Sequence, residues 1–472
     1  MKKWSGLAIR ADPSILYRSK DHSGMGLKEA TTEHKRQRLI RRHQLATSKD
    51  PRVLAIHGQF AEVQRQRHKR GTNEWKECIE MEKLRAEVKT GRIVGKPSEG
   101  AGIGFGKRHR CRPKALDKRK AEREEMLRVF SEIAEQERLV EIMSRPLIES
   151  DAHPFEKKGN YFCGWLSWKA AISVDFGWNR VLKKQESFLK FALNAIQDSC
   201  PTPSRLKCWS QASAGDGKCP LGCGKAGTLK HILCACVKAI KEEPQSRITW
   251  RHDSVLLAIY RGVMDAIEEA GKDEDVGVSA ATVTFKTDSG KEYTKASTAL
   301  RDPSPKNVLR GASDWKVQFD LNLGLESEKD RPFPSEVAVV TGKGSRPDGI
   351  IWSMETKTII WIELTSPWEE NFKKNYDLKF KRYNQLAIDL REGKHFGVKW
   401  TVYPHYVEIG ARGGIHELGW GRMCTQLGIS GKARRSLTES VQDAAIHCSH
   451  YIFLCRFHLQ WEPQQLIDTW KK

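Results

Sequence analysis

Two acidic residues, Asp348 and Glu363, stand in a stretch whose residue types predict a β-hairpin. Segments 346–352 and 358–365 are rich in β-branched and aromatic residues, and the short polar connection 353–357 joins them. In an antiparallel pair the start of one strand lies beside the end of the other, so the hairpin brings the two carboxylates together. Paired carboxylates suit Mg²⁺, a hard cation that takes oxygen ligands and can activate a water against a phosphodiester.

A lysine on the following helix is predicted to complete this set. We expect the helix to begin near Ser366, which can cap it. At about 100° per residue, Lys379 falls on the apolar stripe of this helix, whereas Lys381 falls on the opposite face. The Lys379 ammonium would then point towards the carboxylates and could orient the attacking water or stabilise negative charge. The alternative is that none of the three has a catalytic role. Asp348 would then be a turn residue, Glu363 a charge at a strand end, and Lys379 a side chain whose stem lies along apolar surface. The stripe consists of Phe372, Tyr376, Tyr383, Leu386 and Leu390.

Further residues around the hairpin are predicted to contact a nucleic acid. Arg346 is a candidate phosphate contact, with simple solvent exposure as its alternative. Tyr383 either packs the stem of the lysine or contacts phosphate, and the basic residue Arg382 directly precedes it. Asp320 is a candidate extra metal ligand, which ranks below a structural capping role.

A cysteine-rich segment upstream has the spacing of a zinc site, Cys219-x3-Cys223-x7-His231-x4-Cys236. Three thiolates and one imidazole form a closed tetrahedral set suited to structural Zn²⁺, with no open position for catalysis. Gly222 and Gly224 can supply the tight turn between the first two ligands. Cys234 is an extra thiol that could replace a ligand. The alternative is a group of buried free cysteines around a hydrogen-bonded histidine.

The charge of the chain favours polyanion partners. The 472 residues carry a formal net charge of +22, and residues 1–150 contain 35 Lys and Arg against 21 Asp and Glu. Each cation placed on a phosphate releases condensed counterions, although a solvated basic surface has the same composition. No apolar run reaches the ~18 residues of a membrane span, and no secretory signal is expected.

The elements that must position these residues follow from periodicity and breakers. Residues 1–95 are expected to be helical and basic, and the glycine-rich segment 96–115 a linker. Residues 116–145 and 185–200 each have the pattern of a helix, and Asp253 is the expected N-cap of another. From about residue 335 the pattern is β-β-α-β, followed by helices to the end.

These motifs together resemble the C-terminal region of non-LTR retrotransposon polyproteins that carry a restriction-like endonuclease of the PD-(D/E)xK type. In that variant the lysine is displaced from the second strand onto the next helix, and Lys379 fits this position while Thr365 occupies the ordinary one. Blocks similar to the family lie at 191–196, 250–256, 313–321, 363–370 and 379–383, and more faintly at 15–70.

The resemblance implies an α+β chain with a basic helical N-terminal half, a small CCHC zinc knuckle, an α/β restriction-endonuclease-like domain and C-terminal helices. It implies Mg²⁺-dependent nicking of target DNA for primed synthesis, structural Zn²⁺, DNA and element RNA as partners, and a nuclear location. No Asp-Asp pair occurs in the chain, so polymerase activity is not expected. The alternatives are a non-catalytic nucleic-acid-binding protein and a decayed element product. The predicted domain boundaries follow the same order. They give a basic helical region with a linker at 1–115, a helical linker at 116–205, the zinc knuckle at 206–245, a helical connector at 246–300, the endonuclease core at 301–415 and C-terminal helices at 416–472.

Overall fold

The computed structural model of the chain divides into two compact units. The N-terminal unit comprises 14–19 and 24–145, and the C-terminal unit comprises 1–13, 20–23 and 146–472. The predicted linker 96–115 lies outside the described residues. The structure describes residues 7, 11–19, 24–67, 118–144, 165, 171–172, 174, 186–209, 215–242, 246–272, 282–286, 292–296, 307–321, 346–394 and 397–461.

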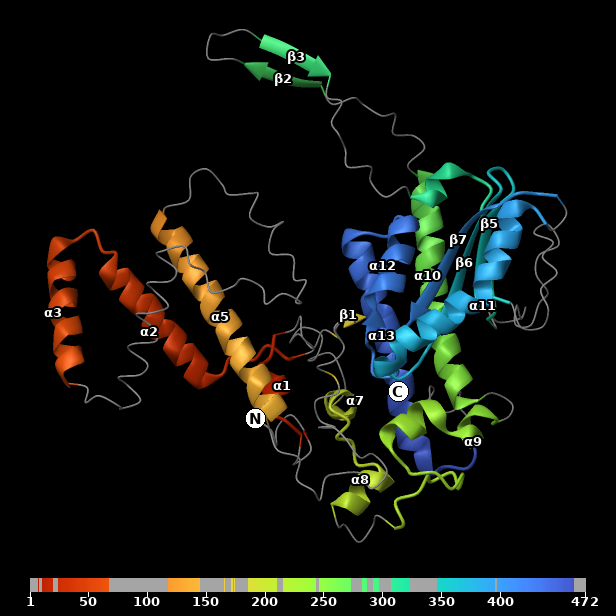
Figure 1. Ribbon diagram of the computed structural model, residues 1–472, viewed down its shortest axis with the longest axis horizontal. Coiled ribbons are helices and arrows are strands. Elements are labelled where there is room, and N and C mark those ends of the chain that lie inside the picture. Colours follow the sequence, from red (N-terminus) through yellow and green to blue (C-terminus); the bar gives the residue numbers. More distant parts are fainter. Residues whose placement is uncertain are drawn as a thin grey trace. The chain divides into compact units, whose positions relative to one another are not determined.

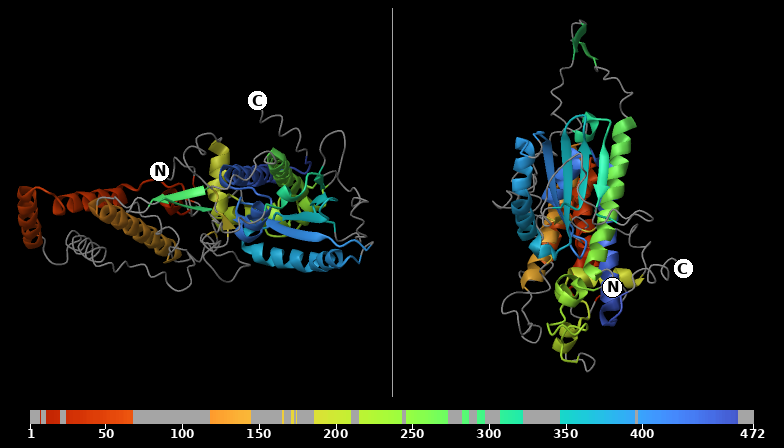
Figure 2. Two further views of the ribbon diagram at one scale, coloured as in Figure 1. Left: turned by 90° about the horizontal axis from the view of Figure 1, so that it is seen from above. Right: turned by 90° about the vertical axis from the view of Figure 1, so that its right-hand side faces the viewer.

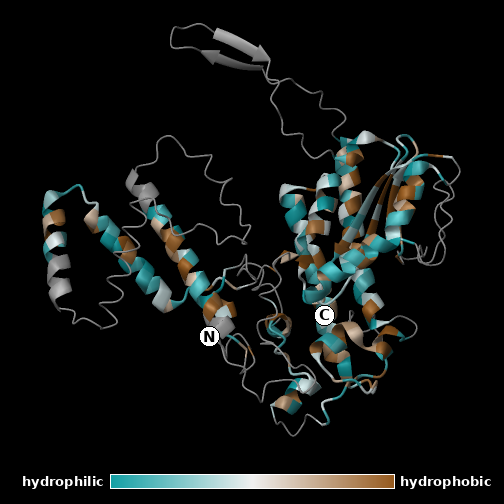
Figure 3. Ribbon diagram, viewed as in Figure 1, coloured by the Kyte–Doolittle hydropathy of each residue, from teal (hydrophilic) through white to brown (hydrophobic). Residues whose placement is uncertain are grey.

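The N-terminal unit is helical where it is described. Its long helix α5 coincides with the predicted 116–145 segment and packs Met126 and Val129 against Leu39 of α2. Helix α2 is mostly hydrophilic in Figure 3, as expected of a basic helix with few buried side chains. The helices are α1 (Ser14–Tyr17), α2 (Ala30–Ala46), α3 (Pro51–Arg67) and α5 (Lys118–Ser144).

The C-terminal unit combines helices with a small mixed sheet, which agrees with the α+β class. Its strands are β1 (Ala171–Ile172), β2 (Thr282–Lys286), β3 (Glu292–Ala296), β4 (Lys316–Phe319), β5 (Gly349–Ser353), β6 (Thr358–Thr365), β7 (Thr401–Glu408) and β8 (Ile415–His416). Its helices are α7 (Glu186–Ile196), α8 (Pro203–Cys208), η6 (His231–Ala235), α9 (Val237–Ile240), α10 (Arg247–Lys272), η8 (Val308–Gly311), η9 (Glu369–Asn371), α11 (Phe372–Glu392), α12 (Glu417–Gln426), α13 (Gly431–Leu454) and η10 (Cys455–Phe457).

The main sheet has the strand order β4-β5-β6-β7. Strands β4, β5 and β6 are antiparallel neighbours, as a hairpin and a preceding strand predict. Strand β7 is parallel to β6, so the chain must cross over between them, and α11 makes that connection. The predicted β-β-α-β order is therefore confirmed.

Both faces of this sheet are covered, which explains why β5 and β6 are buried along almost their whole length. One face carries Ile351, Ile360 and Ile362, which pack against α10, α12 and α13. The other carries Ile350, Ile359 and Trp361, which pack against α11. Figure 1 labels these elements, and the right-hand view of Figure 2 shows the sheet between α10 and α11.

Two predicted helix starts are corrected by the structure. Helix α10 begins at Arg247, six residues before the predicted cap Asp253, and Ser246 accepts a hydrogen bond from the Thr249 N–H (2.9 Å). The apolar residues that guided the prediction begin at Val255, although Trp250 is already buried in the first turn. The helix after β6 begins at Glu369 as the 3₁₀ turn η9, so Ser366 does not cap it.

Several other predicted elements are confirmed. Helix α7 ends before Pro201, and Pro203 opens α8 with Thr202 as its N-cap. Strand β2 covers the predicted strand-like run at 281–286. In the described ranges, no helix is both long enough and apolar enough to cross a bilayer.

Candidate functional site

The β5–β6 hairpin brings Asp348 beside Glu363. Its register pairs Gly349 with Ile362, so the residue before Gly349 lies next to the residue after Ile362. One oxygen of Asp348, Oδ2, accepts a hydrogen bond from the Leu364 N–H (2.7 Å). This bond crosses from the start of β5 to the end of β6 and fixes the Asp348 carboxylate at that edge.

Glu363 is a buried acid, 3% exposed, on the α11 face of β6. Its Oε1 accepts a hydrogen bond from the Lys379 ammonium, while its Oε2 has no hydrogen-bond partner among the described residues. Burial and the nearby charge of Asp348 raise the pKa of Glu363, against the lowering effect of Lys379. A carboxylate in this position needs a positive charge beside it.

Lys379 supplies that charge from α11. As the stripe predicted, it points inward, and its side chain retains 25% exposure. Lys381 on the next half-turn is exposed, which confirms the predicted difference between the two lysines. The three side chains predicted to act together are thus joined at one end of the sheet by the Lys379–Glu363 ion pair and the hairpin register.

The predicted nucleic-acid contacts are distributed differently. Arg346 pairs with Asp320 (2.8 Å), and the Asp320 N–H donates to Asp348 O (2.8 Å), so Asp320 braces the start of β5. Tyr383 is 1% exposed and its hydroxyl donates to Arg346 O (2.8 Å), which favours its packing role and leaves no surface for a phosphate. Arg382 is exposed, with its guanidinium 5.6 Å from the Tyr383 ring centroid.

His252 of α10 was not assigned a role from the sequence. Its Nε2 lies 3.3 Å from Asp348 Oδ2, and its Nδ1 lies 3.2 Å from Asp253 Oδ1. Burial alone would lower the pKa of His252, but the carboxylates of Asp348 and Asp253 outweigh it and raise the pKa to about 10. The signal was present in the sequence, since His252 precedes Val255 and Leu256 by three and four residues on the buried stripe.

Glu408 is a second residue that sequence reasoning missed. It is fully buried at the end of β7, where the parallel register places it opposite Thr365. It shares a hydrogen bond with His416 Nδ1 (2.9 Å). Burial raises the pKa of Glu408, while His416 and the more distant Lys379 act to lower it. The available signal was a charged residue between two apolar neighbours, Val407 and Ile409, which are both buried.

The predicted knuckle ligands converge. The ligand atoms of Cys219, Cys223, His231 and Cys236 all lie within 4.8 Å of one another. The Cys219 and Cys236 sulfurs are 3.7 Å apart, and Cys223 Sγ lies 3.1 Å from His231 Nε2. Tetrahedral ligands at about 2.0–2.3 Å from a metal stand roughly 3.3–3.8 Å apart. The two sulfurs match this spacing and the sulfur–nitrogen pair is slightly closer, so the set is compatible with structural zinc.

The backbone and electrostatics of the knuckle also fit a cation. Gly222 and Gly224 adopt φ of 68° and 77°, which confirms their predicted role in the turn. Burial, together with Cys223 and Cys236, raises the pKa of Cys219 to about 12, a cost that a bound cation would remove. Cys234 is outside the ligand set, and its sulfur lies 3.8 Å from an Arg251 nitrogen.

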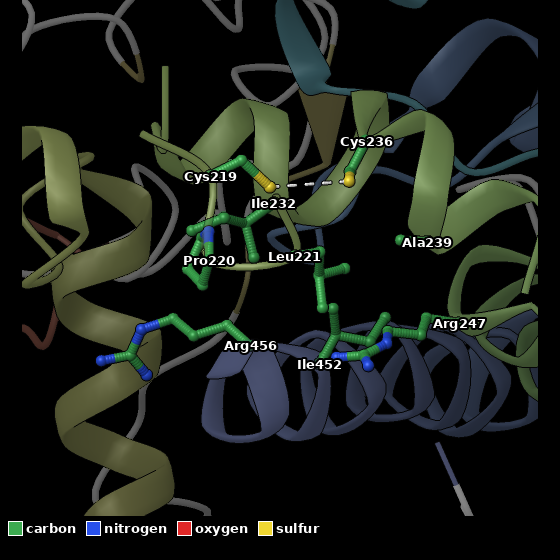
Figure 4. Close-up of a pocket in the computed structure, with 9 residues that line it drawn as sticks. All are labelled: Cys219, Pro220, Leu221, Ile232, Cys236, Ala239, Arg247, Ile452 and Arg456. Atoms are coloured by element: carbon green, nitrogen blue, oxygen red, sulfur yellow. Dashed lines mark hydrogen bonds between the residues drawn. The ribbon is translucent and has the colours of Figure 1, made fainter. Parts of the chain in front are cut away.

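The knuckle is packed into the C-terminal unit. A small cavity beside it is lined by Cys219 and Cys236 on one side and by Arg247 of α10 and Ile452 of α13 on the other (Figure 4). The Arg247 guanidinium donates to Cys455 O and His458 O, both at 2.6 Å. The segment therefore shares its packing with the helices that cover the sheet.

Asp348 and Glu363 supply two carboxylates to a hard cation, which is fewer ligands than a site built from protein side chains alone would need. Among the described residues, the knuckle alone offers three or more His, Cys, Asp or Glu ligands within 4.8 Å. Mg²⁺ is commonly held by one or two carboxylates, with water and substrate phosphates as its other ligands. Two features match this way of binding Mg²⁺. Oε2 of Glu363 has no hydrogen-bond partner among the described residues, and Asp348 lies beside Glu363 at the start of β5.

Comparisons with protein-family models and with characterised proteins give no match to this chain.

Proposed function

We propose that the C-terminal unit is a metal-dependent DNA endonuclease of the PD-(D/E)xK type. The observation that carries the proposal is the meeting of Asp348, Glu363 and Lys379 at one end of the sheet. The strand order, with an antiparallel trio followed by a crossover helix and a parallel strand, supports a restriction-endonuclease-like core. The order acid, acid, lysine along the chain matches the family pattern that the sequence resembles.

Each residue has a definite task in this proposal. Asp348 and Glu363 would hold one or two Mg²⁺ ions, which supply an activated water and stabilise the leaving oxygen. The Leu364 N–H and His252 keep the Asp348 carboxylate in a fixed orientation. The Lys379 ammonium donates to Glu363, a position from which it would orient the attacking water or stabilise the charge on the phosphate.

The expected biological role is nicking of chromosomal DNA to expose a 3′-hydroxyl for primed synthesis, in the nucleus. Zinc would hold the knuckle in its folded form. The polymerase step belongs to another protein or another part of the element, since the metal-binding Asp-Asp pair of a polymerase does not occur in this chain.

The decisive experiment compares nicking of supercoiled plasmid by the wild-type chain and by Asp348→Asn, with and without Mg²⁺. The asparagine keeps an acceptor for the Leu364 N–H and removes the charge, so we expect the variant to fold and to lose Mg²⁺-dependent nicking. Asp377→Asn, an exposed position on α11, is the matched control and should retain the rate. Equal nicking by Asp348→Asn and the wild type would refute the assignment.

A second function, nucleic-acid binding without cleavage, is favoured by one observation. Between residues 207 and 241 the charged side chains are six lysines and Asp216, and all six lysines are exposed. The lysines are Lys207, Lys218, Lys225, Lys230, Lys238 and Lys241. Salt-sensitive DNA binding with no nicking in Mg²⁺ would favour this function, whereas neither activity would favour a decayed element product.

A further inference from the structure

Arg251 is a fully buried arginine that touches three separate parts of the C-terminal unit. Its exposed fraction is 0%, although arginine is rarely buried without strong reason. One terminal nitrogen donates to Ser449 Oγ of α13 (3.2 Å). The other terminal nitrogen donates a hydrogen bond to Ser366 O (3.1 Å). It also donates a weaker hydrogen bond to the sulfur of Cys234 (3.8 Å).

The Cys234 contact ties Arg251 to the knuckle. Cys234 lies in η6, between the ligands His231 and Cys236, so the placement of its sulfur depends on the fold of the ligand loop. A metal held by residues on both sides of Cys234 fixes this π-helical turn from its two ends. Cys234, whose thiol is not a ligand, connects this turn to α10 through Arg251.

The Ser366 contact ties the same guanidinium to the acid pair. Ser366 directly follows β6, three residues after Glu363, so its carbonyl marks where the strand ends. The neighbouring residue His252 lies against Asp348 Oδ2 (3.3 Å). Two consecutive residues of α10 thus contact the segments that carry both acids.

We propose that Arg251 is a positioning residue that couples the zinc-loaded knuckle to the geometry of Asp348 and Glu363. The path runs from η6 through Cys234 to Arg251, and from Arg251 to the end of β6. Zinc at the knuckle and a divalent cation at the acids should then strengthen each other's binding, since such coupling is reciprocal. The cation part rests on the proposed nuclease function, whereas the effect on β6 does not.

The test measures two quantities on the full-length chain, with zinc bound and after chelation. The first is Mn²⁺ affinity by electron paramagnetic resonance. The second is amide hydrogen exchange of the segments 363–368 and 401–408. In the wild type, chelation should weaken Mn²⁺ binding by about 5- to 10-fold. It should also accelerate exchange at 363–368 and leave β7 at 401–408 protected.

Variants locate the coupling. In Arg251→Met the zinc dependence of both quantities should disappear, and Arg251→Lys should restore part of it. Arg261→Met, an exposed arginine on the same helix, is the matched control and should behave as the wild type. If Arg251→Met does not fold, Cys234→Ala removes only the knuckle contact and should reduce the zinc dependence alone.

The outcomes separate this inference from the nuclease proposal. Absence of Mn²⁺ binding by the zinc-loaded wild type would refute the cation site, while hydrogen exchange at 363–368 would still decide the coupling. If the amide hydrogen-exchange rates of 363–368 are the same with zinc bound and after chelation, the coupling is overturned. A uniform loss of protection that includes β7 would also overturn it, because zinc would then hold the whole fold rather than act through Arg251.

Discussion

Lys379 is the residue in the candidate site whose replacement should separate chemistry from binding. Lys379→Met keeps the length of the side chain and removes the ammonium that donates a hydrogen bond to Glu363. We expect nicking to fall by about 100-fold or more, as when one charge-stabilising donor is removed from a transition state. Gel assays of plasmid nicking would measure the rate.

The matched control for this change is Lys381→Met on the exposed face of α11. DNA binding measured by fluorescence anisotropy should change little in either variant. If both lysine variants nick DNA at the wild-type rate, Lys379 has no role in catalysis and its ion pair with Glu363 is only structural.

His252 predicts how stability depends on pH. Its pKa of about 10 in the folded chain lies above the ~6.5 of an unfolded histidine, so the folded state binds the extra proton. The stabilisation is therefore complete below about pH 6.5 and is lost as the pH rises through about 10. Urea denaturation of the wild type and His252→Gln at pH 6, 8 and 9.5 should show a difference in unfolding free energy that shrinks with pH. A difference that stays constant would contradict this prediction.

At the scale of elements, the parallel pairing of β6 and β7 depends on helices that close over both faces. Helix α12 approaches β7 closely at Gly419, where an added Cβ would collide with Tyr406 O. Tyr406 lies opposite Glu363 in the β6–β7 register, so this contact supports the strand end that carries the acid. Close backbone packing of this kind has room only for glycine.

Gly419→Ala should accordingly destabilise the C-terminal unit by about 3 kcal/mol, the upper part of the range for overpacking. Gly421→Ala, two residues along the same helix, is the control. There an added Cβ would meet only Arg434, at 3.6 Å from a side-chain nitrogen, and the change should stabilise α12 by about 0.5–1 kcal/mol. Thermal unfolding of the two variants measures both effects, and equal melting temperatures would show that α12 is not packed as described.

For the whole molecule, the surplus of positive charge predicts salt-dependent binding to DNA. The logarithm of the affinity should fall linearly with the logarithm of salt concentration, by about 0.9 per phosphate neutralised. Replacing both Lys225 and Lys238 of the knuckle by glutamine should reduce this slope by about 2.

The control for the knuckle lysines is Lys272→Gln, at the end of α10, where the ammonium pairs with Glu268 (2.7 Å). It should leave the slope nearly unchanged. An unchanged slope in the knuckle variant would instead assign the DNA contacts to other basic parts of the chain.

The sequence by itself determined the features that depend on local spacing. The β5–β6 hairpin follows from two apolar segments and a short polar turn, and its register brings Asp348 to Glu363 without reference to any distant residue. The knuckle follows in the same way, because four ligands within eighteen positions leave little choice of partner. The inward direction of Lys379 required only the helical period.

Only the tertiary structure decided which distant residues complete these sites. His252 reaches Asp348, and Arg251 reaches the Ser366 carbonyl just after β6, because α10 packs across the sheet. Glu408 lies at the same end of the sheet because β7 pairs in parallel with β6 after a crossover. Such contacts depend on how separate elements pack. The helical period places Arg251 and His252 near the buried stripe of α10, but it does not say which residues of other elements they meet. The misplaced starts of α10 and α11 have the same origin, since capping depends on the exact turn that precedes each helix.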